Sequence, residues 1–206
     1  EVFSVDEVFM NVSQEAAIYG GPIRMAQAIK AAFLESLGEH ITATIGIASS
    51  KTFAKLVAAR HKLDGIGRLD EEEVPELLAA TAVGKICGIG PRIEARLDRI
   101  GIRTLAELGA TPETYLRREF GKYGCFLHAV GNGYDPSPIS PHVRTSLVKS
   151  IGHSRSLRPD LRELQSALLV LRGLCDRVAW RMRRAGYVGR TVHCGYRLVS
   201  LHGSHA

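Results

Sequence analysis

Two adjacent carboxylates near the start of the chain are the residues best suited to chemistry. Asp6 and Glu7 interrupt an apolar run that extends from residue 2 to residue 10. Neighbouring residues on an extended strand point to opposite faces, so a tight bend is needed before both carboxylates can reach one site. Such a pair is costly unless a cation lies between them, and oxygen ligands without a nearby His or Cys suit Mg²⁺. A polar hairpin turn without metal would explain the same dipeptide, because Asp is a common turn residue.

The elements that must position this hairpin follow directly. Residues 22–37 carry apolar side chains at helical spacing and end before a glycine, which predicts a helix. Residues 41–48 alternate and are rich in Ile and Thr, which predicts a strand. Ser50 suits the N-cap of a further helix over 51–61, and residues 66–69 are consistent with a short strand. This order favours a sheet with helices on one face.

The rest of the chain divides into a helical block, a linker and a basic block. Residues 70–134 read as short helices separated by glycines, with the acids of 70–73 at a helix N-terminus, where the helix dipole favours them. Residues 135–143 fall in a Pro- and Gly-rich stretch that predicts a tether. In the block 144–206 the pattern predicts a strand over 145–157, an amphipathic helix over 161–184 and a strand over 191–201. The apolar side chains of that helix, Trp180 among them, are expected in a core.

Composition excludes several classes of protein. The chain has 206 residues, and 45% of them are apolar, which is too many for a disordered chain. No apolar run reaches about 18 residues, so no membrane span is predicted. The N-terminus carries no signal-peptide pattern, and the four scattered cysteines indicate a reduced, cytoplasmic protein without a zinc site or disulfide framework.

The positive charge is concentrated in the last third. The net charge is −1 for residues 1–65, −2 for 66–138 and +9 for 139–206. Such a segment is typical of a module that contacts nucleic-acid phosphates, although a solvated basic surface would look the same.

A glycine-rich connection in the helical block is the second candidate site. Residues 86–97, ICGIGPRIEARL, resemble a helix-hairpin-helix motif. Gly88 and Gly90 allow a tight loop, and Pro91 begins the next helix, so backbone N–H groups are available to a DNA phosphate, with Arg92 nearby. An ordinary connection between two helices is the alternative.

Four segments in order give a resemblance to a known family. Residues 4–10 (SVDEVFM), 44–59 (TIGIASSKTFAKLVAA), 83–91 (VGKICGIGP) and 149–152 (KSIG) resemble motifs of the Y-family lesion-bypass DNA polymerases, most closely the DinB (Pol IV-like) branch. The resemblance implies an α+β chain. It would hold part of the palm in 1–69, an all-helical thumb in 70–134 and part of a β-α-β little finger in 144–206.

The resemblance also implies roles for individual residues. Asp6 and Glu7 would be catalytic carboxylates that bind Mg²⁺, two ions in the complete site, with Ser4 near the primer terminus. The first catalytic Asp and the fingers of the family have no counterpart here, and the end of the little finger is also missing. We therefore expect a fragment that binds DNA weakly and does not polymerise alone.

Further basic residues are expected at the substrates. By resemblance, Lys62 would reach the triphosphate of the incoming dNTP and Lys51 would approach the primer backbone, while Lys55, on the same helix face, is less certain. In the last block the DNA-binding candidates are Arg144, Lys149, His153 and Arg155. Primer-template DNA and dNTP are the implied partners, and a sliding clamp would bind through a segment absent from this chain.

Two other functions remain open at this point. A catalytically lost paralogue could act as a DNA-binding accessory protein, although it has no reason to keep two crowded acids. A stand-alone helix-hairpin-helix protein would leave the Asp6–Glu7 hairpin unexplained.

Overall fold

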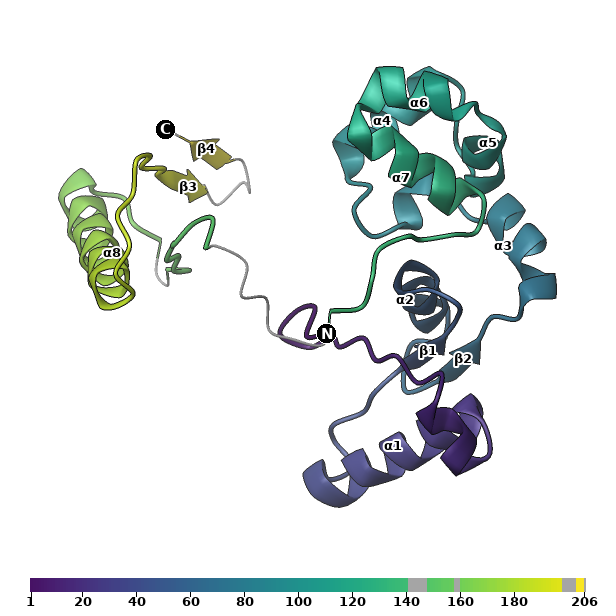
Figure 1. Cartoon of the computed structure of the whole chain (residues 1–206). Helices are drawn as coiled ribbons and strands as arrows, with labels where there is room; N and C mark the ends of the chain where they lie inside the picture. The colour runs from purple at the N-terminus through teal and green to yellow at the C-terminus, as the bar shows by residue number, and fades with distance from the viewer. Residues whose placement is uncertain (141–147, 158–159, 198–202, 206) are drawn as a thin grey trace. The chain divides into compact units, whose positions relative to one another are not determined.

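Helix α2 (Lys51–Arg60) lies at the centre of the first part of the chain (Figure 1). The computed structural model describes residues 1–140, 148–157, 160–197 and 203–205. Strand β1 (Ile45–Ile47) precedes α2 and β2 (Ile66–Arg68) follows it, and the two strands pair in parallel with Ile45 opposite Ile66. This is a strand-helix-strand crossover, the connection that parallel strands require.

Helix α1 (Pro22–Leu37) has the bounds that its apolar spacing predicts. It follows the short 3₁₀ helix η1 (Glu15–Tyr19), and both α1 and α2 contact the two-stranded sheet. Strand β1 is shorter than the predicted 41–48, because only three of its residues pair with β2. The predicted α+β class and its helix-rich middle block are confirmed.

A helical unit follows β2, and its core is fully buried. The residues that are 0% exposed come from four different helices: Leu97, Leu105, Leu108, Leu116, Leu127 and Val130. Figure 1 shows α4 to α7 gathered into one bundle. Its elements are η2 (Glu71–Glu73), α3 (Val74–Ala80), η3 (Val83–Lys85), α4 (Pro91–Arg99), α5 (Leu105–Ala110), α6 (Glu113–Phe120) and α7 (Lys122–Gly131).

Helix α2 joins this core to the sheet. Its Phe53 and Leu56 belong to the same buried cluster as the helical unit, while Val57 is buried as well. Residues at spacings of three and four lie on one helix face, so a single face of α2 serves both contacts. The other side chains of α2 therefore extend from a helix backbone that packing holds in place.

The last unit begins after residue 144. It contains α8 (Leu164–Arg184) and an antiparallel pair, β3 (Gly195–Arg197) and β4 (Gly203–His205). The strand predicted over 145–157 is wrong for its described part, since 148–157 have no regular structure. A strand requires a partner ladder, and β3 and β4 pair with each other.

The predicted core around α8 is also wrong. No residue of α8 is buried, and Trp180 is 54% exposed. Amphipathic spacing predicts a helix but says nothing of what covers its apolar face. Of the helices that the structure describes, none is both long and apolar enough to cross a membrane.

The contact between β1 and α2 gives the first prediction. A Cβ at Gly46 would lie 1.9 Å from the Ala54 carbonyl oxygen and 2.6 Å from the Ala58 nitrogen, both backbone atoms of α2. Gly46→Ala should therefore lower the free energy of unfolding by about 2–3 kcal/mol, the upper range for overpacking, because backbone cannot move aside as a side chain can. Urea unfolding of the 206-residue chain measures it. Gly152→Ala is the control, since its Cβ would meet nothing within 4 Å. Equal midpoints for the two variants would contradict the prediction.

Candidate active site

The first nine residues form the expected hairpin. Val2 and Val8 are an antiparallel bridge pair. The Phe3 amide donates to the Glu7 carbonyl at 2.9 Å, and the Phe9 amide donates to the Glu1 carbonyl at 2.8 Å. The rings of Phe3 and Phe9 meet edge to face, 5.2 Å apart. These contacts place residues 4–7 at the tip.

The bend brings both carboxylates to one hydroxyl. Ser4 Oγ lies 2.8 Å from Asp6 Oδ1 and 3.2 Å from Glu7 Oε2. A serine hydroxyl has one hydrogen, so it donates to one carboxylate at a time. The two acids therefore meet at a single point with one shared donor. These oxygen donors fit a hard divalent cation. No group of three or more His, Cys, Asp or Glu among the described residues could hold a metal by itself.

Two lysines of α2 bind the two arms of the hairpin. Lys55 Nζ lies 2.5 and 2.6 Å from the two carboxylate oxygens of Glu7. Lys51 Nζ lies 3.1 Å from Glu1 Oε2 and 3.1 Å from the carbonyl oxygen of Pro138. Residues four apart lie on one helix face. The face of α2 that carries its lysines therefore neutralises one acid at each end of the hairpin.

The segment after α7 also contacts the hairpin. The Ser140 amide donates to Glu1 Oε2 at 3.0 Å. This backbone hydrogen bond, together with the Lys51 ammonium, lowers the pKa of Glu1. Glu1 is thus held as a carboxylate between α2 and residue 140.

The N-terminus of α2 is capped by a distant residue. Ser50 occupies the N-cap position, but its hydroxyl makes no capping hydrogen bond and has no partner among the described residues. Instead, Thr52 donates to Asp135 Oδ2 through its hydroxyl at 2.6 Å and its amide at 3.3 Å. A carboxylate satisfies the unpaired N–H groups of a helix start and is favoured by the dipole. The sequence analysis placed the N-cap at the correct position, but the capping side chain is that of Asp135, not that of Ser50.

Asp135 is buried and ionised. The residue is 6% exposed, and its other carboxylate oxygen accepts from the Ser137 amide at 2.8 Å. Burial alone raises the pKa of Asp135, but the hydrogen bonds from Ser137 and Thr52 outweigh it, so the net pKa is lowered.

Lys62 lies in the turn after α2, at the opposite end of the helix from Lys51. It is exposed, and the described residues offer it no hydrogen bond or ion pair. Its role at the triphosphate stays a prediction. The amine of Lys51 is engaged by Glu1 and Pro138, so a contact with the primer backbone requires it to leave them.

The glycine-rich connection has the geometry of a tight loop. Gly88 has φ +98°, a left-handed conformation that favours glycine, and Gly90 is the N-cap of α4. Ile86 and Ile89 anchor the loop in the core, while Arg92 is exposed. An open pocket of about 520 Å³ separates this loop from α2, and Lys55, Lys85 and Cys87 line it. Lys55 therefore lies between the acid hairpin and the loop.

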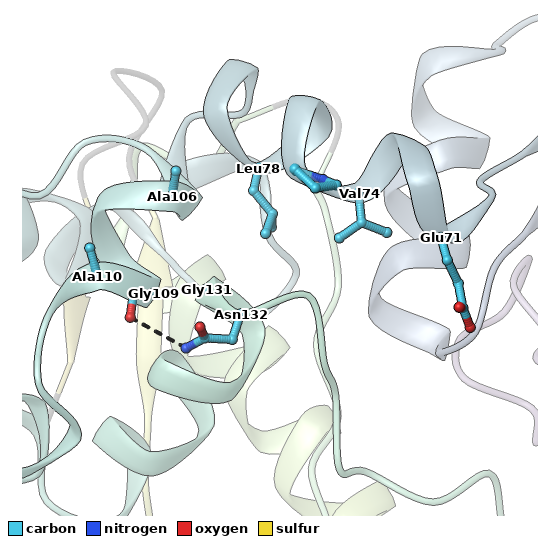
Figure 2. A pocket seen from close by; sticks show the side chains of 9 residues that line it. Glu71, Val74, Leu78, Ala106, Gly109, Ala110, Gly131 and Asn132 are labelled. Carbon is cyan, nitrogen blue, oxygen red and sulfur yellow. Dashed lines mark hydrogen bonds between the residues drawn. The ribbon is translucent and has the colours of Figure 1, made fainter.

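A second pocket, of about 430 Å³, lies within the helical unit (Figure 2). Val74, Leu78 and Ala106 line it, and Asn132 donates to the Gly109 carbonyl at 3.3 Å. Its one titratable side chain is Glu71. It holds no group that could assist the hairpin acids.

The basic candidates of the last unit lie on an irregular segment. Lys149, His153 and Arg155 are exposed within 148–157, and Arg144 lies outside the described residues. Arg181 of α8 donates to the Gly152 carbonyl at 2.7 Å, which fixes the segment to the helix. Their DNA contacts stay predictions.

Sequence reasoning missed two residues that the geometry makes important. Glu1 was given no role, and Asp135 was placed in a tether. An acid just before a proline in a linker could have signalled Asp135, since Asp readily accepts bonds from nearby backbone amides. No local pattern could have joined Glu1 to residue 140.

Comparison with known proteins identifies the family. The impB/mucB/samB family matches residues 1–59, its HHH motif matches 71–102 and its C-terminal domain matches 148–203. Together these three matches cover more than half of the chain in the order expected of one family. The chain belongs to the impB/mucB/samB family.

Relatives and solved structures agree. The chain is 40% identical over 192 residues to DNA polymerase IV of Moorella thermoacetica, and 32% identical over 196 residues to DNA polymerase IV 2 of Bacillus subtilis. Each match covers 93% of this chain and 47% of the relative, so the chain spans about half the length of these relatives.

Among structures, a Y-family DNA polymerase chimera matches 100% of this chain and 58% of its own with a TM-score of 0.73 at 25% identity. DinB from Sulfolobus solfataricus matches 66% of this chain and 40% of its own, with a TM-score of 0.56 at 30% identity. The resemblance to the DinB-like Y-family proteins is confirmed.

Asp135 gives the second prediction. Asp135→Ala should lower the free energy of unfolding by about 2 kcal/mol at pH 7, because it removes hydrogen bonds to a charged acceptor and leaves Thr52 unpaired. Because the folded pKa is lowered, this stabilisation is full above the ordinary Asp pKa of about 3.9 and is lost as the pH falls through the folded value. The difference between wild type and variant in urea unfolding should therefore shrink below about pH 4. The exposed Glu39→Gln is the control. A constant difference down to about pH 2 would contradict the prediction.

Proposed function

We propose that the chain is part of the catalytic core of a lesion-bypass DNA polymerase, which transfers a deoxynucleoside monophosphate from dNTP to a primer 3′-hydroxyl. The observation that carries the proposal is the contact of the Ser4 hydroxyl with both carboxylates at the hairpin tip. Relatives named DNA polymerase IV support the reaction class.

The acids at the tip suit the metal that this reaction needs. Asp6 and Glu7 would hold Mg²⁺ through carboxylate oxygens, the donors that this ion prefers. The bound ion would supply Lewis-acid activation of the primer hydroxyl and charge stabilisation of the leaving pyrophosphate. The chain itself contributes the crowding of two negative charges at one point, and the rigid α2 that keeps them there.

Substrate contacts follow from position and charge. Lys62 is an exposed flexible cation at the end of α2, suited to triphosphate oxygens. Gly88, Gly90 and Arg92 present a loop and a helix N-terminus to a DNA phosphate, a contact that does not read sequence. In the last unit, Lys149, His153 and Arg155 are further exposed basic residues suited to phosphate contacts.

A catalytically lost accessory protein is the weaker alternative. Such a protein needs a DNA-binding surface but has no use for two carboxylates held together at a hairpin tip. No observation favours it. A sliding-clamp contact and a cytoplasmic location stay predictions.

The third prediction tests the reaction. A chimera in which this chain replaces the aligned segment of the Moorella thermoacetica polymerase should extend a primer by one nucleotide with Mg²⁺. Asp6→Asn and Glu7→Gln should each lower the rate at least about 100-fold, because a charged metal ligand becomes neutral. Single-turnover primer extension measures the rate, and Glu39→Gln is the matched neutralisation of an exposed acid. Extension by Asp6→Asn at the unsubstituted rate would remove the hairpin from the active site. We expect the 206-residue chain alone not to extend.

The fourth prediction tests the DNA surface. Binding of the 206-residue chain to primer-template DNA should weaken steeply as salt rises, because phosphate contacts release counterions. Arg92→Ala should reduce the slope of log affinity against log salt by about one. Fluorescence anisotropy between about 50 and 200 mM salt measures the affinity and its salt slope. Arg68→Ala is the control, because this arginine of β2 is paired with Asp70. A slope that Arg92→Ala leaves unchanged would place that residue away from the phosphates.

A further inference from the structure

The ion pair between Lys55 and Glu7 involves a carboxylate that is proposed to bind a metal ion. The ammonium group contacts both oxygens of the carboxylate, at 2.5 and 2.6 Å, and also lies 4.8 Å from the centre of the Phe3 ring. A cation is favoured at the face of an aromatic ring. Two groups of the hairpin, the Glu7 carboxylate and the Phe3 ring, therefore hold the amine, which covers the carboxylate proposed as a metal ligand.

The neighbouring acid has no such partner. Asp6 accepts from the Ser4 hydroxyl, and the described residues give it no ion pair. Two carboxylates that meet at one hydroxyl repel each other unless a cation is near. Lys55 is the cation that this structure supplies, and its charge partly balances the pair.

Lys51 shows that holding the hairpin does not require an amine on Glu7. Its ion pair with Glu1 fixes the base of the hairpin to the same helix, and the Ser140 amide adds to it. A second ion pair at the tip is thus not needed to attach the hairpin to α2. The position of Lys55 calls for a different explanation.

We propose that Lys55 is a resident counter-ion of the hairpin: it occupies Glu7 until a divalent cation binds, and the cation displaces its ammonium group. Lys55 then balances the charge of Glu7 in the metal-free hairpin and competes with the metal for that carboxylate. The proposal rests on the proposed function, because it takes Asp6 and Glu7 as metal ligands.

The surroundings of Lys55 allow this exchange. The pocket of about 520 Å³ between α2 and the loop at Gly88 is lined by Lys55 itself. The lysine stem is flexible, and its ammonium group is compact, so it can turn from the carboxylate into this open space. An ammonium group left at Glu7 would repel an incoming divalent cation, since like charges at short distance oppose each other.

The test measures Mn²⁺ binding to the 206-residue chain. Mn²⁺ at the hairpin broadens the amide NMR signals of residues 4–8, and electron paramagnetic resonance counts the free ion. Lys55→Met should tighten Mn²⁺ binding about three- to tenfold, because the competing charge is gone. Lys55→Arg keeps the charge and should bind as wild type does, and Lys51→Met should not bind more tightly.

The sign of the change separates this role from a purely structural one. A lysine that only supported the hairpin would, when replaced, loosen Glu7 and weaken Mn²⁺ binding. Unchanged or weaker binding by Lys55→Met, in a variant whose circular dichroism matches wild type, overturns the proposal. If Lys55→Met does not fold, Mg²⁺ addition to wild type decides. The Lys55 side-chain signals should then shift together with the hairpin amides while those of Lys51 stay, and unmoved Lys55 signals overturn the proposal.

The same experiment distinguishes this inference from the function beneath it. If neither wild type nor Lys55→Met shows Mn²⁺ broadening at residues 4–8, the metal site fails and the inference fails with it. If wild type binds Mn²⁺ there, Asp6→Asn abolishes binding and Lys55→Met binds no tighter, only the counter-ion role is lost.

Discussion

The capping of helix α2 by Asp135 is the interaction on which the rest of the first unit depends. The carboxylate joins the segment after the helical bundle to the start of a helix that packs on the sheet. The same helix contributes Phe53 and Leu56 to the core of the bundle. One helix is therefore held at its end by a buried charge and along its side by apolar contacts, so the backbone from which its lysines extend is fixed.

The position of the acid hairpin depends on that helix. An isolated two-stranded hairpin is marginally stable in water, and this one exposes Val2, Val5 and Val8. Charge attaches its base instead, because Lys51 binds Glu1, and Lys55 pairs with Glu7 at the tip. Both ion pairs are partly shielded from solvent, which makes them stronger than fully exposed pairs. Lys55 thereby balances part of the negative charge that Asp6 and Glu7 concentrate at the hairpin tip.

Local sequence patterns predicted the elements that depend on residues close to one another in the sequence. The helix at 22–37 begins at proline and ends before glycine, and the tight loop at Gly88 needs a left-handed backbone. Elements that need a partner far away in the sequence were harder to predict. The strand over 145–157 had the right residue types, yet its described part pairs with nothing, and the apolar spacing of α8 did not bury Trp180. Periodicity describes one element, whereas pairing and burial depend on a second.

The sequence by itself determined which residues could do chemistry. Asp6 and Glu7, the glycine-rich loop and the basic last third are properties of residue type and spacing, because charge and backbone freedom belong to single residues. The tertiary structure alone decided how these groups meet. Ser50 does not cap its helix while Asp135 does, and the lysines of α2 turn to the acids of the hairpin. Such contacts join residues roughly 50 to 140 positions apart, and only folding brings those groups within the short range over which hydrogen bonds and ion pairs act.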